Sequence, residues 1–112
     1  MRFVKNNIMG IFSNLFGIGT PAVDFKELFL QGAIIVDVRS VEEFKSGHIP
    51  QSQNIPLQTL EQKLDLLKKK NKKIITVCQS GARSGMATTI LNKAGMEAFN
   101  GGNWSALQNK LQ

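Results

Sequence analysis

The sequence carries two short runs of apolar and β-branched residues, Ala33-Ile34-Ile35-Val36 before Asp37 and Ile74-Ile75-Thr76-Val77 before Cys78. Neither run alternates apolar with polar residues in the way of a strand that has one face in water. A continuous run of this length is typical of a strand buried on both faces of a parallel sheet. The two runs therefore predict two core strands, one ending at a carboxylate and the other at a thiol.

Helical patterns lie around and between these strands. Asp24 and Ser40 each begin a capping-box pattern, with a glutamate three residues later, and a glycine is placed to end each helix. The rest of the pattern predicts a leucine-rich helix over 57–67, a helix after 79–82, a third strand over 96–99, a short strand at Asn54-Ile55, a turn at Gly101-Gly102 and a final helix from Trp104. Strands alternating with helices predict an α/β domain with a mostly parallel sheet, flanked by helices on both faces.

The bulk composition limits the kinds of site that the chain can build. Its 112 residues suit one domain with one core. It has one cysteine and one histidine, so we expect neither an internal disulfide nor a zinc site of the usual kind, and no metal or other cofactor. No apolar run is long enough to span a bilayer.

The chain is basic, with a formal net charge of +6, and part of that charge is local. Five lysines flank Asn71, at positions 68, 69, 70, 72 and 73. They suit either an anion-attracting patch or a solvated helix end that complements the helix dipole. We favour the helix end and expect no nucleic-acid partner, because no aromatic residues interleave with the lysines.

Residues 1–19 differ from the rest, and we treat them as a separate amphipathic or leader segment before a domain at 20–112. Apolar residues recur there at roughly helical spacing, which suits a helix packed on the domain or on a membrane surface. Residues 1–22 also resemble a weak secretory signal, and translation from Met9 is a third interpretation. We expect a cytoplasmic protein, or a periplasmic or secreted one if that signal is used.

The most reactive side chain is placed where ligands bind in parallel sheets, just beyond the carboxyl end of a strand. Cys78 is followed by a short segment of small residues and by a helix start, so backbone N–H groups can converge on an anion there. Arg83 adds a positive charge, and Gly81 allows a tight turn. These features favour the thiolate, the nucleophilic form of cysteine. The competing interpretation is an inert, buried thiol.

Several motifs resemble the rhodanese family, in its single-domain form, and the resemblance covers roughly residues 20–112. The motifs are Val36-Asp37-Val38-Arg39, Glu43-Phe44, Gly47-His48-Ile49-Pro50, Asn54-Ile55-Pro56-Leu57, Val77-Cys78-Gln79-Ser80-Gly81-Ala82-Arg83-Ser84, and Gly101-Gly102 followed closely by a tryptophan. Gln51-Ser52-Gln53 departs from the family pattern, which affects a local turn and not the chemistry.

The resemblance implies a sulfurtransferase that takes a sulfane sulfur from thiosulfate or a persulfide and passes it to cyanide, a thiol or a thioredoxin-like protein. Cys78 would be the nucleophile and would carry the sulfur as a persulfide. The substrate-binding groups would be the backbone N–H groups of the following segment and the side chain of Arg83, which would orient the donor. That segment consists of Gln79, Ser80, Gly81, Ala82, Arg83 and Ser84.

Other functions share parts of this pattern. A carrier or interaction module that serves a protein partner would keep Cys78 and differ only in its donor and acceptor. Rhodanese-like phosphatases carry one residue more between cysteine and arginine than the four present here, which argues against a phosphatase. A scaffold without catalysis would have no need of Cys78 and Arg83.

The remaining conspicuous residues are interpreted as structural. We expect Asp37 and Arg39 to tie a strand end to the next helix, with Glu43 as the partner of Arg39. His48 could act as a base, but we expect a structural role in its turn. Trp104 is expected in the core or at the edge of the pocket.

Overall fold

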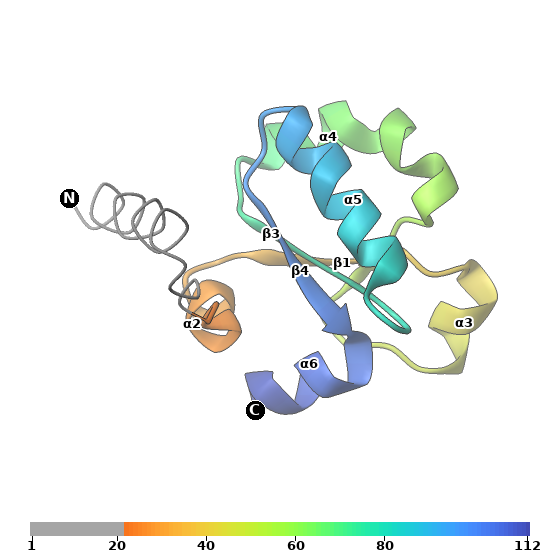
Figure 1. Cartoon of the computed structure of the whole chain (residues 1–112), viewed down its shortest axis with the longest axis vertical. Coiled ribbons are helices and arrows are strands. Elements are labelled where there is room, and N and C mark those ends of the chain that lie inside the picture. Colours follow the sequence, from red (N-terminus) through yellow and green to blue (C-terminus); the bar gives the residue numbers. More distant parts are fainter. Residues whose placement is uncertain (1–21) are drawn as a thin grey trace, which may run out of the picture.

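The two buried runs form the centre of the sheet in the computed structural model of the protein, which describes residues 22–112 (Figure 1). They become β1 (Ile34–Asp37) and β3 (Ile74–Cys78), which pair in parallel with Ile34 opposite Ile74 and Asp37 opposite Val77. The edges are β2 (Gln53–Asn54) and β4 (Ala98–Asn103), and the order β2-β1-β3-β4 is parallel throughout. The predicted parallel sheet is confirmed.

Helices cover both faces of this sheet, as predicted (Figure 1). One face packs against a 3₁₀ helix, η1 (Leu57–Lys63), which runs into α4 (Leu64–Lys70), and against α5 (Ala82–Lys93). The other face packs against α2 (Phe25–Leu30) and α6 (Trp104–Leu111). Every residue of β3 is buried, because this central strand has a helical layer on each side.

The structure confirms the helix ends that the sequence predicts. Asp24 accepts a hydrogen bond from the N–H of Glu27 at the start of α2. Ser40 and Glu43 form a complete capping box at the start of α3 (Val41–Ser46), which ends at Gly47. The lysine cluster lies in the last turn of α4 and just beyond it, where its charge meets the negative end of the helix.

Four predicted elements differ from the structure. The short strand covers 53–54, the strand predicted over 96–99 covers Ala98–Asn103, the leucine-rich helix begins as a 3₁₀ helix, and Gly101-Gly102 lies inside β4 and not in a turn. A Cβ on Gly101 would lie 2.8 Å from both the Ile75 side chain and the carbonyl oxygen of Thr76. Glycine therefore lets β4 remain close to β3 through an irregular register as far as Asn103, so the predicted turn is absorbed into the strand.

No helix within residues 22–112 is long and apolar enough to cross a membrane. The interpretations of residues 1–19, including the Met9 start, fall outside the described residues.

Candidate active site

The carboxyl ends of β1 and β3 bring two buried polar groups to the same edge of the sheet. Asp37 ends β1 and Cys78 ends β3, and neither side chain is exposed to solvent. The two groups differ in their partners. The Asp37 carboxylate is bound by the cation of Arg39, whereas the Cys78 sulfur is bound by backbone N–H groups.

The end of β1 is a closed ion pair. Arg39 donates to the Asp37 carboxylate from Nη2 at 2.7 Å and from Nε at 2.9 Å, and its own N–H caps the same carboxylate at 3.0 Å. Arg39 also donates to the carbonyl oxygens of Gly47, at 2.7 Å, and Glu43, at 3.3 Å. The pair therefore ties the strand end to α3, as predicted. The expected Glu43 partner was wrong, because the adjacent Asp37 occupies the guanidinium and Glu43 offers it only a backbone oxygen.

Backbone N–H groups converge on the sulfur at the end of β3. Gly81 donates to Cys78 Sγ at 2.9 Å and Ser84 donates from its backbone at 3.4 Å. Gly81 has a φ of +97° and immediately precedes α5, so this turn directs the start of the helix at the sulfur. A partial positive charge from the helix N-terminus adds to the individual hydrogen bonds.

These contacts determine the acidity of the thiol. Burial disfavours the thiolate and is the largest influence on the pKa of Cys78, but hydrogen bonds to its sulfur outweigh it. They come from the Ser84 side chain, whenever its hydroxyl is turned to the sulfur, and from the N–H groups of Ser84, Gly81 and Ser80. The net effect lowers the pKa of Cys78 below its ordinary value and favours the nucleophilic form.

The hydroxyl of Ser84 is shared between the sulfur and an asparagine. Ser84 Oγ lies 3.3 Å from Cys78 Sγ and donates to Asn100 Oδ1 at 2.6 Å. Asn100 is held in this orientation because its amide nitrogen donates to Gly81 O at 3.1 Å and its oxygen accepts from Gly102 N at 3.0 Å. A hydroxyl has one proton, so Ser84 donates to the sulfur only by giving up its bond to Asn100.

The Arg83 side chain reaches α3, where it contacts Glu43. It pairs with Glu43 through two hydrogen bonds, of 2.8 and 3.0 Å, and its side chain is 38% exposed. The Arg83 hydrogen bond and that of the Ser40 N–H lower the pKa of Glu43 to about 2. The same pairing raises the pKa of Arg83. The role of Arg83 in orienting the donor stays a prediction. In the structure Glu43 already pairs with the guanidinium and would compete for it with an anionic donor.

The other predicted residues take different positions. Gln79, Ser80 and Ala82 are exposed at the mouth of the segment 79–84, which we call the Cys78 loop. The carbonyl oxygen of Gln79 accepts from Asn103 Nδ2 at 2.6 Å, which fixes the first peptide of this loop to β4. His48 stacks on Phe44 and its Nδ1 bonds the Phe44 carbonyl oxygen, so its contacts are structural.

Sequence reasoning missed Asn100, Asn103 and the Arg83 contact of Glu43. These residues meet the Cys78 loop from β4 and α3, across 16 to 40 positions of the chain. Two asparagines beside a glycine pair at the end of a strand were the signal in the sequence, but only the register of β4 reveals their partners.

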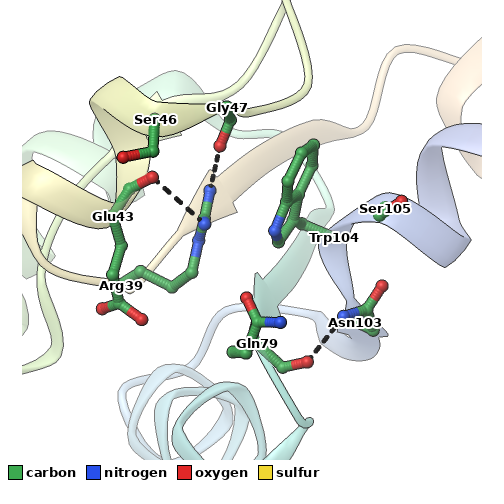
Figure 2. Close-up of a pocket in the computed structure, with 8 residues that line it drawn as sticks. All are labelled: Arg39, Glu43, Ser46, Gly47, Gln79, Asn103, Trp104 and Ser105. Atoms are coloured by element: carbon green, nitrogen blue, oxygen red, sulfur yellow. Dashed lines mark hydrogen bonds between the residues drawn. The ribbon is translucent and has the colours of Figure 1, made fainter.

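A cavity of about 300 Å³ opens beside the Cys78 loop (Figure 2). Its walls come from α3, from Gln79 and from the start of α6, and the indole of Trp104 forms one side. Within residues 22–112 no three His, Cys, Asp or Glu side chains are grouped closely enough to hold a metal ion.

The chain matches the family model "Rhodanese-like domain" over residues 22–106. A putative sulfur carrier protein of Bacillus subtilis, YrkF, is 40% identical over 63 residues, or 56% of this chain and 34% of that protein. A putative mitochondrial thiosulfate sulfurtransferase of Schizosaccharomyces pombe is 28% identical, over 73% of this chain and 68% of that one. Of the first two curated relatives, the match spans only 34% and 49% of the length.

Solved structures with this fold include two whose names describe sulfur chemistry. A human single-domain sulfurtransferase superposes with a TM-score of 0.61 at 27% identity, covering 80% of this chain and 97% of that one. A rhodanese from Escherichia coli, solved with anions, superposes with a TM-score of 0.60 at 28% identity, covering 66% and 89% respectively. Both matches extend the sequence similarity to the arrangement of the sheet and its helices.

Proposed function

The chain belongs to the rhodanese-like domain family, and on that premise we propose that it is a sulfurtransferase whose Cys78 carries a sulfane sulfur as a persulfide. The observation that carries the proposal is the set of N–H groups from Gly81, Ser84 and Ser80 that face one sulfur at a strand end. Such a set stabilises a thiolate before the reaction and a persulfide anion after it. A cytoplasmic location is part of the proposal, because residues 1–22 make a poor secretory signal.

The reaction divides into two displacements at sulfur. The Cys78 thiolate attacks the outer sulfur of thiosulfate, the sulfur–sulfur bond of the donor breaks, and sulfite leaves with its electron pair. An acceptor, either cyanide or a thiolate, then attacks the outer sulfur of the Cys78 persulfide and releases the Cys78 thiolate. Covalent catalysis of this kind replaces one difficult transfer with two easier ones.

The Cys78 loop would hold the charges that form along this path. Its backbone N–H groups lie around the sulfur, where the sulfite leaving group and the persulfide anion carry negative charge. Arg83 would attract an anionic donor, but Glu43 competes for its guanidinium at 2.8 Å. Thiosulfate is therefore expected to bind less tightly than it would beside an unpaired arginine.

A second candidate is a sulfur carrier that exchanges only with protein partners, such as a thioredoxin-like acceptor or a persulfide-bearing donor. The pairing of Arg83 with Glu43 favours it, because that pairing reduces the attraction of the site for small anions. One of the relatives is named a putative sulfur carrier. The two candidates share the persulfide on Cys78 and differ in the molecules that load and unload it.

Intact-mass measurement after incubation with thiosulfate tests the proposal, with and without dithiothreitol and alongside the Cys78→Ser variant. We expect a mass gain of about one sulfur atom that dithiothreitol removes and that the variant lacks. A gain seen only with a protein persulfide donor would favour the carrier. No gain with either donor, or an equal gain in Cys78→Ser, would refute the persulfide on Cys78.

A further inference from the structure

The cavity beside the Cys78 loop contains charged side chains but offers no free charge. Arg39 is neutralised by Asp37 and covers the Trp104 ring, with its guanidinium carbon 4.8 Å from the ring centroid. Glu43 is neutralised by Arg83 and also accepts from the Ser40 N–H at 3.0 Å. With both charges paired inside the protein, a charged ligand would gain little from either residue.

Neutral groups of the cavity remain available to a ligand. Among residues 22–112, none bonds the indole N–H of Trp104, the side-chain amide of Gln79 or the hydroxyl of Ser105, although all three residues line the cavity. In the view of Figure 2, the indole of Trp104 lies between Arg39 and Ser105, and the Gln79 side chain lies on the side of the indole nitrogen. An indole N–H with nearby amide and hydroxyl groups offers hydrogen-bond donors and acceptors that match the N–H and carbonyl groups of a peptide unit.

This cavity is adjacent to the reacting sulfur. Gln79 follows Cys78 directly, and consecutive Cα atoms are about 3.8 Å apart. Asn103, on the same wall, is the register partner of Cys78. The cavity therefore lies at the end of the strand that carries the nucleophile. The volume of about 300 Å³ is at the small end of ligand pockets, which suits a short segment and not a large cofactor.

We propose that this cavity binds the uncharged peptide part of a cysteinyl acceptor and so directs sulfur to thiols flanked by amide groups. The inference rests on the proposed function, since it assigns the acceptor of the second displacement. The acceptor thiolate attacks the outer sulfur of the Cys78 persulfide, a new sulfur–sulfur bond forms, and the bond to Cys78 Sγ breaks. The acceptor leaves as a persulfide, the proton that its thiol lost can return to Cys78, and no external oxidant or reductant is consumed.

Three small acceptors separate the possible origins of selectivity. N-Acetylcysteinamide has a thiol and two neutral amides, N-acetylcysteine has a carboxylate in place of the second amide, and 2-mercaptoethanol has no amide. Cyanide serves as an acceptor with no peptide-like part at all. The full chain is first loaded with sulfur, the loading is measured by intact mass, and kcat/KM is then determined for each acceptor.

The matched variants place the same aromatic ring inside and outside the cavity. Ser105→Phe fills it from the exposed start of α6, whereas Asn109→Phe adds a ring to an exposed position of the same helix that does not line it. We expect Ser105→Phe to reduce kcat/KM for N-acetylcysteinamide about tenfold, as for the loss of two neutral hydrogen bonds. Its kcat/KM for 2-mercaptoethanol and cyanide should fall much less, and every value for Asn109→Phe should stay at the wild-type level.

Two results would overturn this inference. One is unchanged transfer to N-acetylcysteinamide in Ser105→Phe, and the other is an equal loss for all acceptors. Both leave the proposed function standing as long as the mass of the loaded protein shows sulfur on Cys78. Failure to load the wild-type chain would instead refute the proposed function itself. N-Acetylserinamide, which cannot accept sulfur, gives an independent check: it should inhibit the wild type competitively against N-acetylcysteinamide and inhibit Ser105→Phe much less.

Discussion

The ends of β1 and β3 are neighbours in the sheet and both bury a group that can carry negative charge, yet they serve different purposes. At β1 the Asp37 carboxylate is bound by the guanidinium of Arg39, an opposite charge from its own segment. At β3 the sulfur of Cys78 is bound by backbone N–H groups that bear only partial charges. The Asp37 carboxylate keeps its countercharge at all times. Cys78 can gain or lose a proton, and in the proposed function a sulfur atom, without leaving an unpaired cation behind.

This difference indicates where reactivity is located in the molecule. A buried full charge needs its partner at all times, so the Asp37–Arg39 pair can contribute to structure but not to turnover. N–H groups at a helix start stabilise an anion, and they leave no unpaired full charge behind when the bound group becomes neutral. Both strand ends are buried. The structural end of β1 differs from the candidate catalytic end of β3 in that its buried group is paired with a full opposite charge.

The largest expected effect is on stability at the end of β1. Asp37→Asn keeps the size of the side chain but leaves Arg39 buried without its countercharge, which should cost about 3–5 kcal/mol of unfolding free energy. Glu43→Gln breaks the half-exposed pair with Arg83 and should cost less than about 1 kcal/mol. Urea unfolding followed by circular dichroism gives both values. Equal losses of unfolding free energy in the two variants would contradict the distinction between the buried and the half-exposed ion pair.

The next effect concerns the charge near the sulfur. Glu43→Gln leaves an oxygen for the Ser40 N–H but frees the guanidinium of Arg83, so KM for thiosulfate should fall about threefold, in keeping with a part-exposed charge. Arg83→Ala should raise KM for thiosulfate and leave KM for an uncharged sulfane-sulfur donor nearly unchanged. Steady-state kinetics with both donors provide the measurement. A parallel change for charged and uncharged donors would argue against a cation that orients the donor.

A smaller effect is expected from the asparagine that takes the Ser84 proton. Asn100→Ala removes the competing acceptor, so the Ser84 hydroxyl turns to the sulfur and the pKa of Cys78 falls further. The rate of alkylation by iodoacetamide at neutral pH should rise about twofold to threefold, less than the full worth of one hydrogen bond. The Arg83–Glu43 pair must stay unchanged in this comparison, because the charge of Arg83 also interacts electrostatically with Cys78.

A double variant identifies the route of this effect. In a Ser84→Ala background, Asn100→Ala should no longer change the pH profile of alkylation, because there is no hydroxyl left to redirect. The same shift in both backgrounds would mean that Asn100 acts by holding the Cys78 loop in place through Gly81 and Gly102.

The smallest effect is the acid dependence of the Glu43–Arg83 pair. The pKa of Glu43 is lowered from 4.5 to about 2, so its ionised form is favoured by folding. The resulting stability is fully present above pH 4.5 and is lost as the pH falls toward 2. The difference in unfolding free energy between the wild type and Glu43→Gln should be constant above that range and disappear below it. A difference that stays constant to pH 2 would contradict the shift.

The sequence predicted what depends on neighbouring residues. β1 and β3 were visible as apolar runs, and the helix starts at Asp24 and Ser40 were visible as capping patterns, because a few adjacent side chains determine them. The convergence of backbone N–H groups on Cys78 was predicted for the same reason, because the small residues and the helix start follow Cys78 directly in the sequence. The parallel sheet followed from the alternation of elements along the chain.

The partners of the loop could not be predicted from local pattern. Ser84 meets Asn100 across 16 positions and Arg83 meets Glu43 across 40, and both contacts depend on how β4 and α3 are placed in space. The contact at Gly101 had the same origin: whether a glycine ends a strand or lets it continue depends on the side chain of Ile75 on the neighbouring strand. Sequence spacing cannot specify a contact that only the folded sheet creates.

Cys78 is the only thiol in these 112 residues, and it is fully buried. If Cys78 carries sulfur as proposed, a loaded copy has no second cysteine among these residues that could displace the sulfur and close a disulfide. The lifetime of the loaded form is then set by encounters with other molecules, and it shortens in proportion to the concentration of acceptor. The fraction of copies that carry sulfur at any moment becomes a measure of the balance between donor supply and acceptor demand.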